Sequence, residues 1–263
     1  MTKANGKTAL ITGSTDGVGR VVAKRLADDG WGVLVHGRDR GRGEALVADI
    51  KAAGGTAEFV QADLSSTAEV RRLAVAVQKT TRRLDLLINN AGLGSGVSRT
   101  TRRTSLDGHE LLFAVNYLAG FLLTNLLLPL LKESAPARIV NVASLGQQAI
   151  DFDDVMLTHC YSGSRAYCQS KLAQILFTID LAGELAGSGV TVNALHPATY
   201  MNTTMVRQSG VTPISSVEGA DAILKLAVAP ELKAKAASIS MASAKSAPMP
   251  RPTTPMRGSS SRG

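Results

Sequence analysis

A tyrosine and a lysine stand four positions apart in the segment RAYCQSKLAQ, as Tyr167 and Lys171. On a helix, side chains at this spacing share one face, so the lysine ammonium can approach the tyrosine phenol. A nearby cation favours the phenolate and lowers the pKa of a tyrosine, which is ordinarily near 10. The pair therefore predicts a general acid/base. A packed tyrosine beside a solvated lysine has the same spacing, however, and only other segments can decide between the two.

A glycine-rich turn, TGSTDGVG (12–19), is the first such segment. Its glycines allow a tight turn and a close approach of backbone N–H groups to a pyrophosphate at the start of a helix. The turn lies between an apolar run (8–12) and a helical pattern, which is the context that a dinucleotide-binding turn requires. The residues predicted to bind the cofactor phosphates are Gly13, Ser14, Thr15, Asp16, Gly17, Val18 and Gly19.

The ends of the next apolar runs predict which dinucleotide binds and where its adenine lies. Arg38 follows VLVHG and offers a forked guanidinium to a 2′-phosphate, which favours NADP over NAD unless Arg38 is only a surface residue. Asp63, with Leu64 beside the adenine ring, either accepts a hydrogen bond from the adenine amino group or caps a helix. The small residues of NNAG, where the backbone can approach the cofactor, are Asn90, Ala91 and Gly92.

The elements that must position these residues alternate along the chain. Six apolar, strand-like runs are separated by segments with helical periodicity, which predicts an α/β fold with a doubly wound parallel sheet of Rossmann type and helices on both faces. In such sheets ligands bind at the carboxyl ends of the strands, where the glycine turn, Arg38 and Asp63 are placed. The runs are 8–12, 32–37, 57–63, 84–92, 137–144 and 190–197.

Composition limits the classes to which the chain can belong. Its 263 residues, 44% of them hydrophobic, suit one domain, which we expect over residues 1–232. The polar start of the chain, without a signal pattern, predicts a cytoplasmic protein. The longest apolar run (117–131) is short for a membrane span and contains Pro129, so we expect a buried or subunit-interface helix and no span.

Charge and potential metal ligands bear on two further classes. Five of the eight excess positive charges fall in residues 234–263, and the basic cluster 98–104 has no interleaved aromatic residues, so we expect no nucleic-acid partner. Two cysteines and four scattered histidines lack the spacing of metal ligands, so we predict no metal site.

Taken together, TGSTDGVG, NNAG, the serine that ends IVNVAS, and YCQSK resemble the motifs of the short-chain dehydrogenase/reductase family, over roughly residues 5–230. The segments IDFDD and HPATYMNT are similar to those of its retinol-dehydrogenase-like branch. The resemblance implies that Ser144 binds the substrate oxygen and that Tyr167 transfers the proton as hydride passes to or from the nicotinamide. It also implies that Lys171 lowers the tyrosine pKa and binds the nicotinamide ribose, while Asn116 holds a relay water.

The same resemblance implies further contacts and an assembly. Tyr167 and Lys171 count as cofactor contacts, and Thr203 would add a hydroxyl. The segment 200–215 is polar and contains Gly210 and Pro213, which predicts either a mobile substrate lid or an ordinary surface loop. Members of the family are commonly dimers or tetramers, so we expect a homodimer or homotetramer that pairs the apolar helix. The residues expected to close over the nicotinamide are Pro197, Ala198, where many relatives have glycine, and Thr199.

From residue 233 the chain departs from the family pattern, which continues into a seventh strand. Residues 233–263 contain no acid and are rich in Ala, Ser, Pro and Met, a composition that resists packing. We therefore predict an irregular tail and a sheet that lacks a normal seventh strand.

The sequence as a whole predicts an NADP(H)-dependent oxidoreductase that interconverts an alcohol and a carbonyl on a small, lipophilic substrate. The alternative is a catalytically silent dinucleotide-binding sensor or partner-binding module. The intact catalytic set favours the enzyme, and the abnormal tail favours the module.

Overall fold

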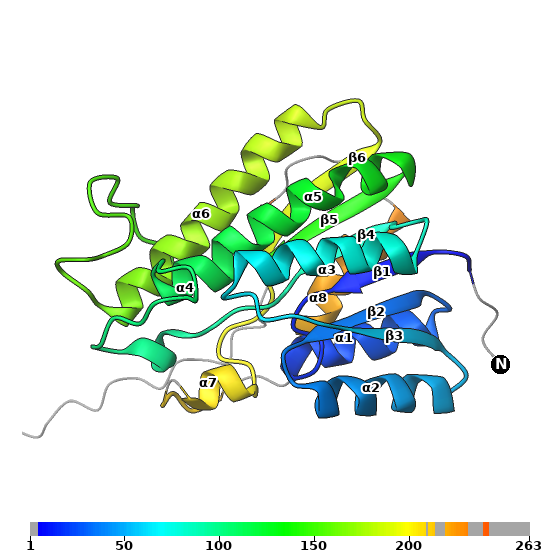
Figure 1. The fold of residues 1–263 in the computed structure, drawn as a ribbon, viewed down its shortest axis with the longest axis horizontal. Helices are drawn as coiled ribbons and strands as arrows, with labels where there is room; N and C mark the ends of the chain where they lie inside the picture. Colours follow the sequence, from blue (N-terminus) through cyan, green and yellow to red (C-terminus); the bar gives the residue numbers. More distant parts are fainter. Residues whose placement is uncertain (1–4, 209, 214–218, 231–238, 242–263) are drawn as a thin grey trace, which may run out of the picture.

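The computed structural model describes residues 5–208, 210–213, 219–230 and 239–241. Within these residues a parallel sheet is covered by helices on both faces, which gives three layers (Figure 1). The predicted doubly wound α/β fold is confirmed, with the strand order β3-β2-β1-β4-β5-β6-β7. The strands are β1 (Thr8–Ile11), β2 (Gly32–Gly37), β3 (Thr56–Gln61), β4 (Leu86–Asn89), β5 (Ala137–Val142), β6 (Val190–His196) and β7 (Ile239–Met241).

Apolar side chains on both sides of the strands require a helical layer on each face. One core contains Val22, Leu26 and Ile223 and joins the sheet to α1 (Gly17–Asp28), α2 (Arg40–Ala52) and α8 (Gly219–Val228). The second core joins it to α3 (Thr67–Thr80), α5 (Ala119–Glu133) and α6 (Gly163–Glu184). Shorter described segments are the 3₁₀ turn η1 (Ser95–Ser98), α4 (Leu111–Phe113), the π-helical turn η2 (Ala114–Leu118) and α7 (Thr204–Gln208).

The strand order reverses beside β1. This strand pairs with β2 on one side and with β4 on the other, so the connections that leave β1 and β4 run to opposite faces of the sheet. A crevice forms at the carboxyl ends of the strands at such a switch point. The glycine turn follows β1 and the NNAG segment follows β4, so the topology brings the two together.

One helical stretch among the described residues, Leu111–Glu133, is long and apolar enough to cross a membrane by length and composition. It has 23 residues, and its most apolar 18-residue window has a mean hydropathy of 1.9 and is half buried inside the protein. Leu123, Leu127 and Leu131 are fully buried in the core between the helices and the sheet. This stretch therefore packs one face in the core, and a subunit contact on its other face remains a prediction.

The prediction for the C-terminal tail needs a correction. Residues 239–241 form β7, which pairs in parallel with Ala194, Leu195 and His196 of β6. The sheet thus has a seventh strand, although it is only three residues long. Composition did not reveal it, because the exposed edge of β6 supplies hydrogen-bonding groups to any extended segment that reaches it. The other residues of the predicted irregular tail, 233–238 and 242–263, lie outside the described residues.

Candidate active site

The glycine turn between β1 and α1 has the backbone of a phosphate-binding loop. Gly13 and Gly17 have φ angles of +64° and +53°, in a region of backbone conformation that residues other than glycine rarely adopt. At Gly19 an added Cβ would lie 2.4 Å from the Asn90 amide nitrogen and 2.5 Å from the Gly13 carbonyl oxygen. These three positions admit no side chain, which fits the close approach of a cofactor pyrophosphate to the backbone.

The remaining residues of the turn differ in what they can offer a cofactor. Ser14 and Val18 are buried, so they can contribute only backbone groups. Thr15 lies against Gly37, where an added Cβ would come within 2.6 Å of its side chain. Asp16 caps α1 by accepting a hydrogen bond from Gly17 N at 2.7 Å, and Arg42 lies 3.7 Å from its other carboxylate oxygen.

The NNAG segment braces the glycine turn from the side of β4. Thr12 Oγ1 accepts hydrogen bonds from the backbone N–H groups of Asn90 and Ala91, each at 3.0 Å. The Asn90 carboxamide donates to the carbonyl oxygens of Thr12 and Gly13 at 2.8 and 3.1 Å. Asn90 and Ala91 therefore shape the turn, and their contact with the cofactor remains a prediction.

His36, at the end of β2, is a site residue that sequence reasoning missed. Its Nδ1 accepts a hydrogen bond from Gly13 N at 3.1 Å, and its backbone groups bond both the N–H and the hydroxyl of Ser14. Burial lowers the pKa of His36 to about 4, so the ring is neutral at pH 7 and Nδ1 is free to accept. No sequence signal marks this role, because the bond joins residues that only the fold brings together.

We expect this buried ring to make the stability of the protein depend on pH. The pKa of an unfolded histidine is near 6.5, so between pH 6.5 and 4 the unfolded chain binds a proton that the folded protein does not. The free energy of unfolding should fall by about 3 kcal/mol over this window. His36→Asn, whose amide oxygen can accept from Gly13, should lose that dependence in urea unfolding at pH 7 and pH 4. The exposed His159 is the control position, and a His36→Asn protein with the wild-type dependence would contradict the expectation.

An open cleft of about 460 Å³ lies beyond the ends of β2 and β3 and brings Arg38 and Asp63 together. Asp63 Oδ1 accepts a hydrogen bond from Ser65 N at 2.9 Å, so part of its carboxylate stabilises the turn before α3. Leu64 is buried and lines a small internal cavity, and its contact with the adenine ring remains a prediction. The residues that line the cleft are Arg38, Gln61, Ala62, Asp63, Glu69 and Arg72.

Ser144, Tyr167 and Lys171 come together where β5 ends against α6. Tyr167 and Ser144 share a hydrogen bond between their side chains, and the Ser144 hydroxyl also accepts from Gly146 N at 3.2 Å. The ammonium of Lys171 lies 6.0 Å from the centre of the Tyr167 ring. The helix supplies this face because α6 begins at its cap, Ser162, and turns Tyr167 and Lys171 to the same side.

The electrostatics of this group differ from the sequence-based prediction. Burial raises the pKa of Tyr167, and the hydrogen bond with Ser144 offsets this only in part. Burial also lowers the pKa of Lys171 to about 8. The ammonium donates to Val142 O at 2.8 Å and to Gln174 Oε1 at 3.1 Å. The net shift of the Tyr167 pKa is therefore upward, opposite to the lowering predicted from sequence, because desolvation of the phenol is the largest effect.

Asn116 lies in the π-helical turn η2, an irregularity that often marks functional positions. Its carboxamide accepts from Leu93 N at 2.7 Å and donates to Leu93 O at 3.1 Å and to Ser170 Oγ at 3.0 Å. It thereby ties the segment after β4 to α6, one residue before Lys171. An added Cβ on Gly92 would lie 3.3 Å from Asn116 Oδ1 and 3.7 Å from Lys171 Nζ. The catalytic set predicted from sequence thus shares one end of the sheet, and the relay water remains a prediction.

The segment after β6 returns across the crevice. Pro197 is buried, and the Thr199 hydroxyl lies 3.1 Å from His196 Nε2. Thr203 is also buried, and an added Cβ on Gly17 would lie 3.3 Å from its methyl group. Thr203 therefore lies next to the glycine turn, as expected for a segment that closes over a cofactor, and Ala198 of the same segment is half-buried.

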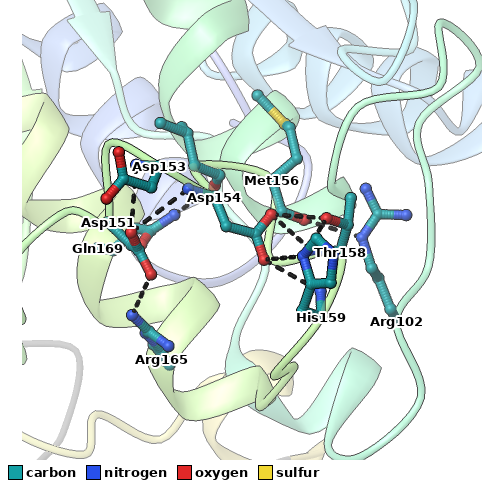
Figure 2. A network of polar contacts seen from close by, with 10 residues as sticks. Arg102, Asp151, Asp153, Asp154, Met156, Thr158, His159, Arg165 and Gln169 are labelled. Atoms are coloured by element: carbon teal, nitrogen blue, oxygen red, sulfur yellow. Dashed lines mark hydrogen bonds and ion pairs between the residues drawn. The ribbon is translucent and has the colours of Figure 1, made fainter.

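The loop before α6 is held by a polar network that Figure 2 shows. Asp154 accepts hydrogen bonds from the backbone N–H groups of Thr158 and His159 and from the Thr158 hydroxyl, which together hold its pKa well below the usual range. Arg165 of α6 pairs with Asp151 at 2.9 Å, and Gln169 donates to Val155 O. The network fixes this loop against the same helix that carries Tyr167.

The fold and the site define a Rossmann-type protein with a dinucleotide-binding turn and a Ser-Tyr-Lys group. Consistently, the sequence pattern of the family described as short chain dehydrogenase matches residues 7–212. The chain belongs to the short-chain dehydrogenase family.

Relatives in this family are similar over most of the chain. Human retinol dehydrogenase 13 is 44% identical over 239 residues, which is 88% of this chain and 70% of that protein. Mouse retinol dehydrogenase 11 is 43% identical over 78% of this chain, which spans only 65% of that protein. The solved structure of the RhlG/NADP active-site complex of Pseudomonas aeruginosa is 32% identical, with a TM-score of 0.64 over 78% of this chain and 77% of that one.

Proposed function

We propose that the protein is an NADP(H)-dependent oxidoreductase that interconverts an alcohol and a carbonyl on a small, lipophilic substrate. The observation that carries this proposal is the meeting of Ser144, Tyr167 and Lys171 beside a glycine turn that admits no side chains. If Tyr167 and Lys171 served only in packing, their position at the ligand crevice of a doubly wound sheet would be a coincidence.

The residues of this chain bind the reactants and handle the proton. The turn from Gly13 to Gly19 would hold the pyrophosphate, and the cofactor would supply or accept the hydride. In the reducing direction Ser144 donates a hydrogen bond to the substrate carbonyl oxygen and Tyr167 delivers the phenolic proton to it. Lys171, charged below its pKa of about 8, then favours the phenolate that remains and returns a proton to it.

A lipophilic substrate is supported by the surroundings of Tyr167. The phenol ring packs against a cluster that includes Leu93, Leu112 and Leu157. The relatives named retinol dehydrogenase act, by that name, on a lipophilic alcohol, and we infer a retinoid-like substrate for this chain. Because the chain spans only part of those proteins, the inference extends to the class of substrate and no further.

Purified protein with NADPH and a panel of aldehydes and ketones, retinaldehyde among them, tests the proposal. We expect oxidation of NADPH by at least one lipophilic carbonyl. Binding of NADPH without turnover on any carbonyl would instead support the catalytically silent module.

The preference for NADP depends on Arg38, which lines the cleft beside β2. A guanidinium bound to a 2′-phosphate contributes a charged hydrogen bond, so Arg38→Leu should weaken NADPH binding about tenfold and leave NADH binding unchanged. Titration of each cofactor by fluorescence measures both affinities. Arg72→Leu, which removes another guanidinium from the lining of the same cleft, is the control, and equal losses for NADPH and NADH in Arg38→Leu would contradict the assignment.

Two further expectations remain proposals. Assembly as a homodimer or homotetramer is supported by exposed apolar side chains on α5 and α6, namely Phe121, Leu176 and Ile179. Sedimentation of the purified chain tests it, and a monomer at micromolar concentration would contradict it.

The cytoplasmic location is likewise a proposal, which cell fractionation would test.

A further inference from the structure

Gln174 is a buried polar residue on α6, three positions after Lys171, and is 3% exposed. Its Oε1 accepts a hydrogen bond from Lys171 Nζ at 3.1 Å. The ammonium's other protein acceptor is the backbone carbonyl oxygen of Val142, whose position is set by β5. Among the described residues, Gln174 therefore supplies the side-chain acceptor of the catalytic ammonium.

An internal cavity of about 10 Å³ lies beside this pair, between Gln174, Asn116, Asn89 and Thr12. This volume is about what the centre of one water molecule requires. Asn89 Oδ1 is buried there and has no hydrogen-bond partner among the described residues. A buried amide oxygen is costly to leave unpaired, so the cavity suits a water that bridges Asn89 and the Gln174 side chain.

A chain of buried hydrogen bonds fixes the helical turn that carries Gln174. The Thr178 hydroxyl donates to Gln174 O and accepts from Asn141 Nδ2, both at 2.8 Å. Asn141 Oδ1 in turn accepts from Asn89 Nδ2 at 2.8 Å. These bonds join α6 to β5 and β4 inside an otherwise apolar layer. Polar groups at such a depth restrict the geometry of the helix, since any shift would break several bonds at once.

We propose that Gln174 is a positioning residue for Lys171, whose ammonium it holds on the sheet side of α6 in the charged form. Acceptance of a hydrogen bond by the Gln174 oxygen favours the ammonium over the neutral amine. Burial acts in the opposite direction and leaves the pKa of Lys171 at about 8. The proposal deepens the proposed function, on which its consequence for turnover rests, whereas the lysine pKa can be measured without turnover.

In the described part of the chain, the groups around this lysine include one ionisable side chain. Tyr167 faces it from the same helix, with the ring centre 6.0 Å from Nζ. The groups that face it from β5, from η2 and from the segment after β4 are Val142, Asn116 and Gly92, and none of these ionises. A change in the pKa of Lys171 can therefore be traced to the residue that is changed.

Two variants of nearly equal size separate positioning from packing. Gln174→Met removes the acceptor, and Gln174→Glu keeps an acceptor oxygen and adds a negative charge. The pKa of Lys171 is read from the ¹³Cε resonance of labelled lysine in the protein alone, assigned with Lys171→Met. We expect the pKa to fall by about one unit in Gln174→Met and to rise by about one unit in Gln174→Glu.

Gln169→Met removes another buried amide from the same helix and should leave the pKa of Lys171 unchanged. Shifts in the same direction in both Gln174 variants, or no shift in either, overturn the proposal. If Gln174→Met does not fold, the Gln174→Glu variant decides: a rise in the pKa of Lys171 supports the proposal, and a fall or no change overturns it.

Turnover provides an independent readout. In the reduction of a carbonyl by NADPH, the alkaline limb of kcat should move by the same amounts and in the same directions, while KM for the carbonyl stays constant. A loss of kcat that is equal at every pH would indicate a packing defect and contradict the proposal. If the wild-type protein reduces no carbonyl, the proposed function fails, and the lysine titration still tests Gln174.

Discussion

Replacing Tyr167 with phenylalanine is expected to lower kcat for carbonyl reduction by about 10²- to 10⁴-fold, the range that general acid/base catalysis contributes. The change removes one oxygen and keeps the ring in its cluster with Leu112 and Leu157. Ser144 can still bind the substrate oxygen, but no group at the phenol position delivers the proton. The loss should therefore appear in kcat and leave KM and the affinity for NADPH nearly unchanged.

The control for this experiment is Tyr117→Phe, which removes the same oxygen from a half-buried tyrosine packed among Phe113, Phe121 and Phe177. It should keep the wild-type kcat and the wild-type affinity for NADPH. A Tyr167→Phe protein with kcat within tenfold of wild type would show that another group moves the proton, because a tenfold change corresponds to only about 1.4 kcal/mol of activation free energy.

Local patterns in the sequence were enough to predict the fold and most residues of the candidate site. Buried strands and amphipathic helices have periodicities that a single segment displays, so the first six strands and the place of the glycine turn were predicted. Residues just after the strands were predicted to contact the cofactor because ligands bind at the carboxyl ends of the strands in such sheets. The roles of Ser144 and Asn116 rested on the family resemblance alone, since each is an ordinary polar residue in its own segment.

What the sequence did not reveal are contacts between segments far apart in the chain. His36 meets Gly13 across 23 positions, Lys171 meets Val142 across 29, and Asn90 meets Thr12 across 78. Such contacts decide which groups are desolvated and which atoms they bond. For that reason the pKa of Tyr167 is raised, where spacing alone predicted that it would be lowered.

The second large effect is expected from Gly19→Ala in the glycine turn. The new methyl group would lie 2.4 Å from Asn90 Nδ2 and 2.5 Å from Gly13 O, well inside van der Waals contact. Neither neighbour can move freely, because Asn90 Nδ2 donates to the carbonyl oxygens of both Thr12 and Gly13. The turn must therefore open, and the backbone N–H groups at the start of α1 must move away from the pyrophosphate.

We expect Gly19→Ala to destabilise the protein by about 1–3 kcal/mol, the usual cost of overpacking. We also expect a loss of NADPH affinity of about a hundredfold, because charge-assisted hydrogen bonds from the turn would be misaligned. Urea unfolding and cofactor titration measure the two effects separately.

Gly183→Ala, in α6, is the matched control, because an added Cβ at Gly183 meets nothing within 4 Å. A helical glycine costs about 0.5–1 kcal/mol relative to alanine, so this control should be slightly more stable than wild type and bind NADPH normally. If Gly19→Ala bound NADPH as well as Gly183→Ala does, close backbone approach would not be the basis of cofactor binding. The case for a dinucleotide at this turn would then fail, and the proposed hydride transfer would fail with it, whatever the catalytic residues do.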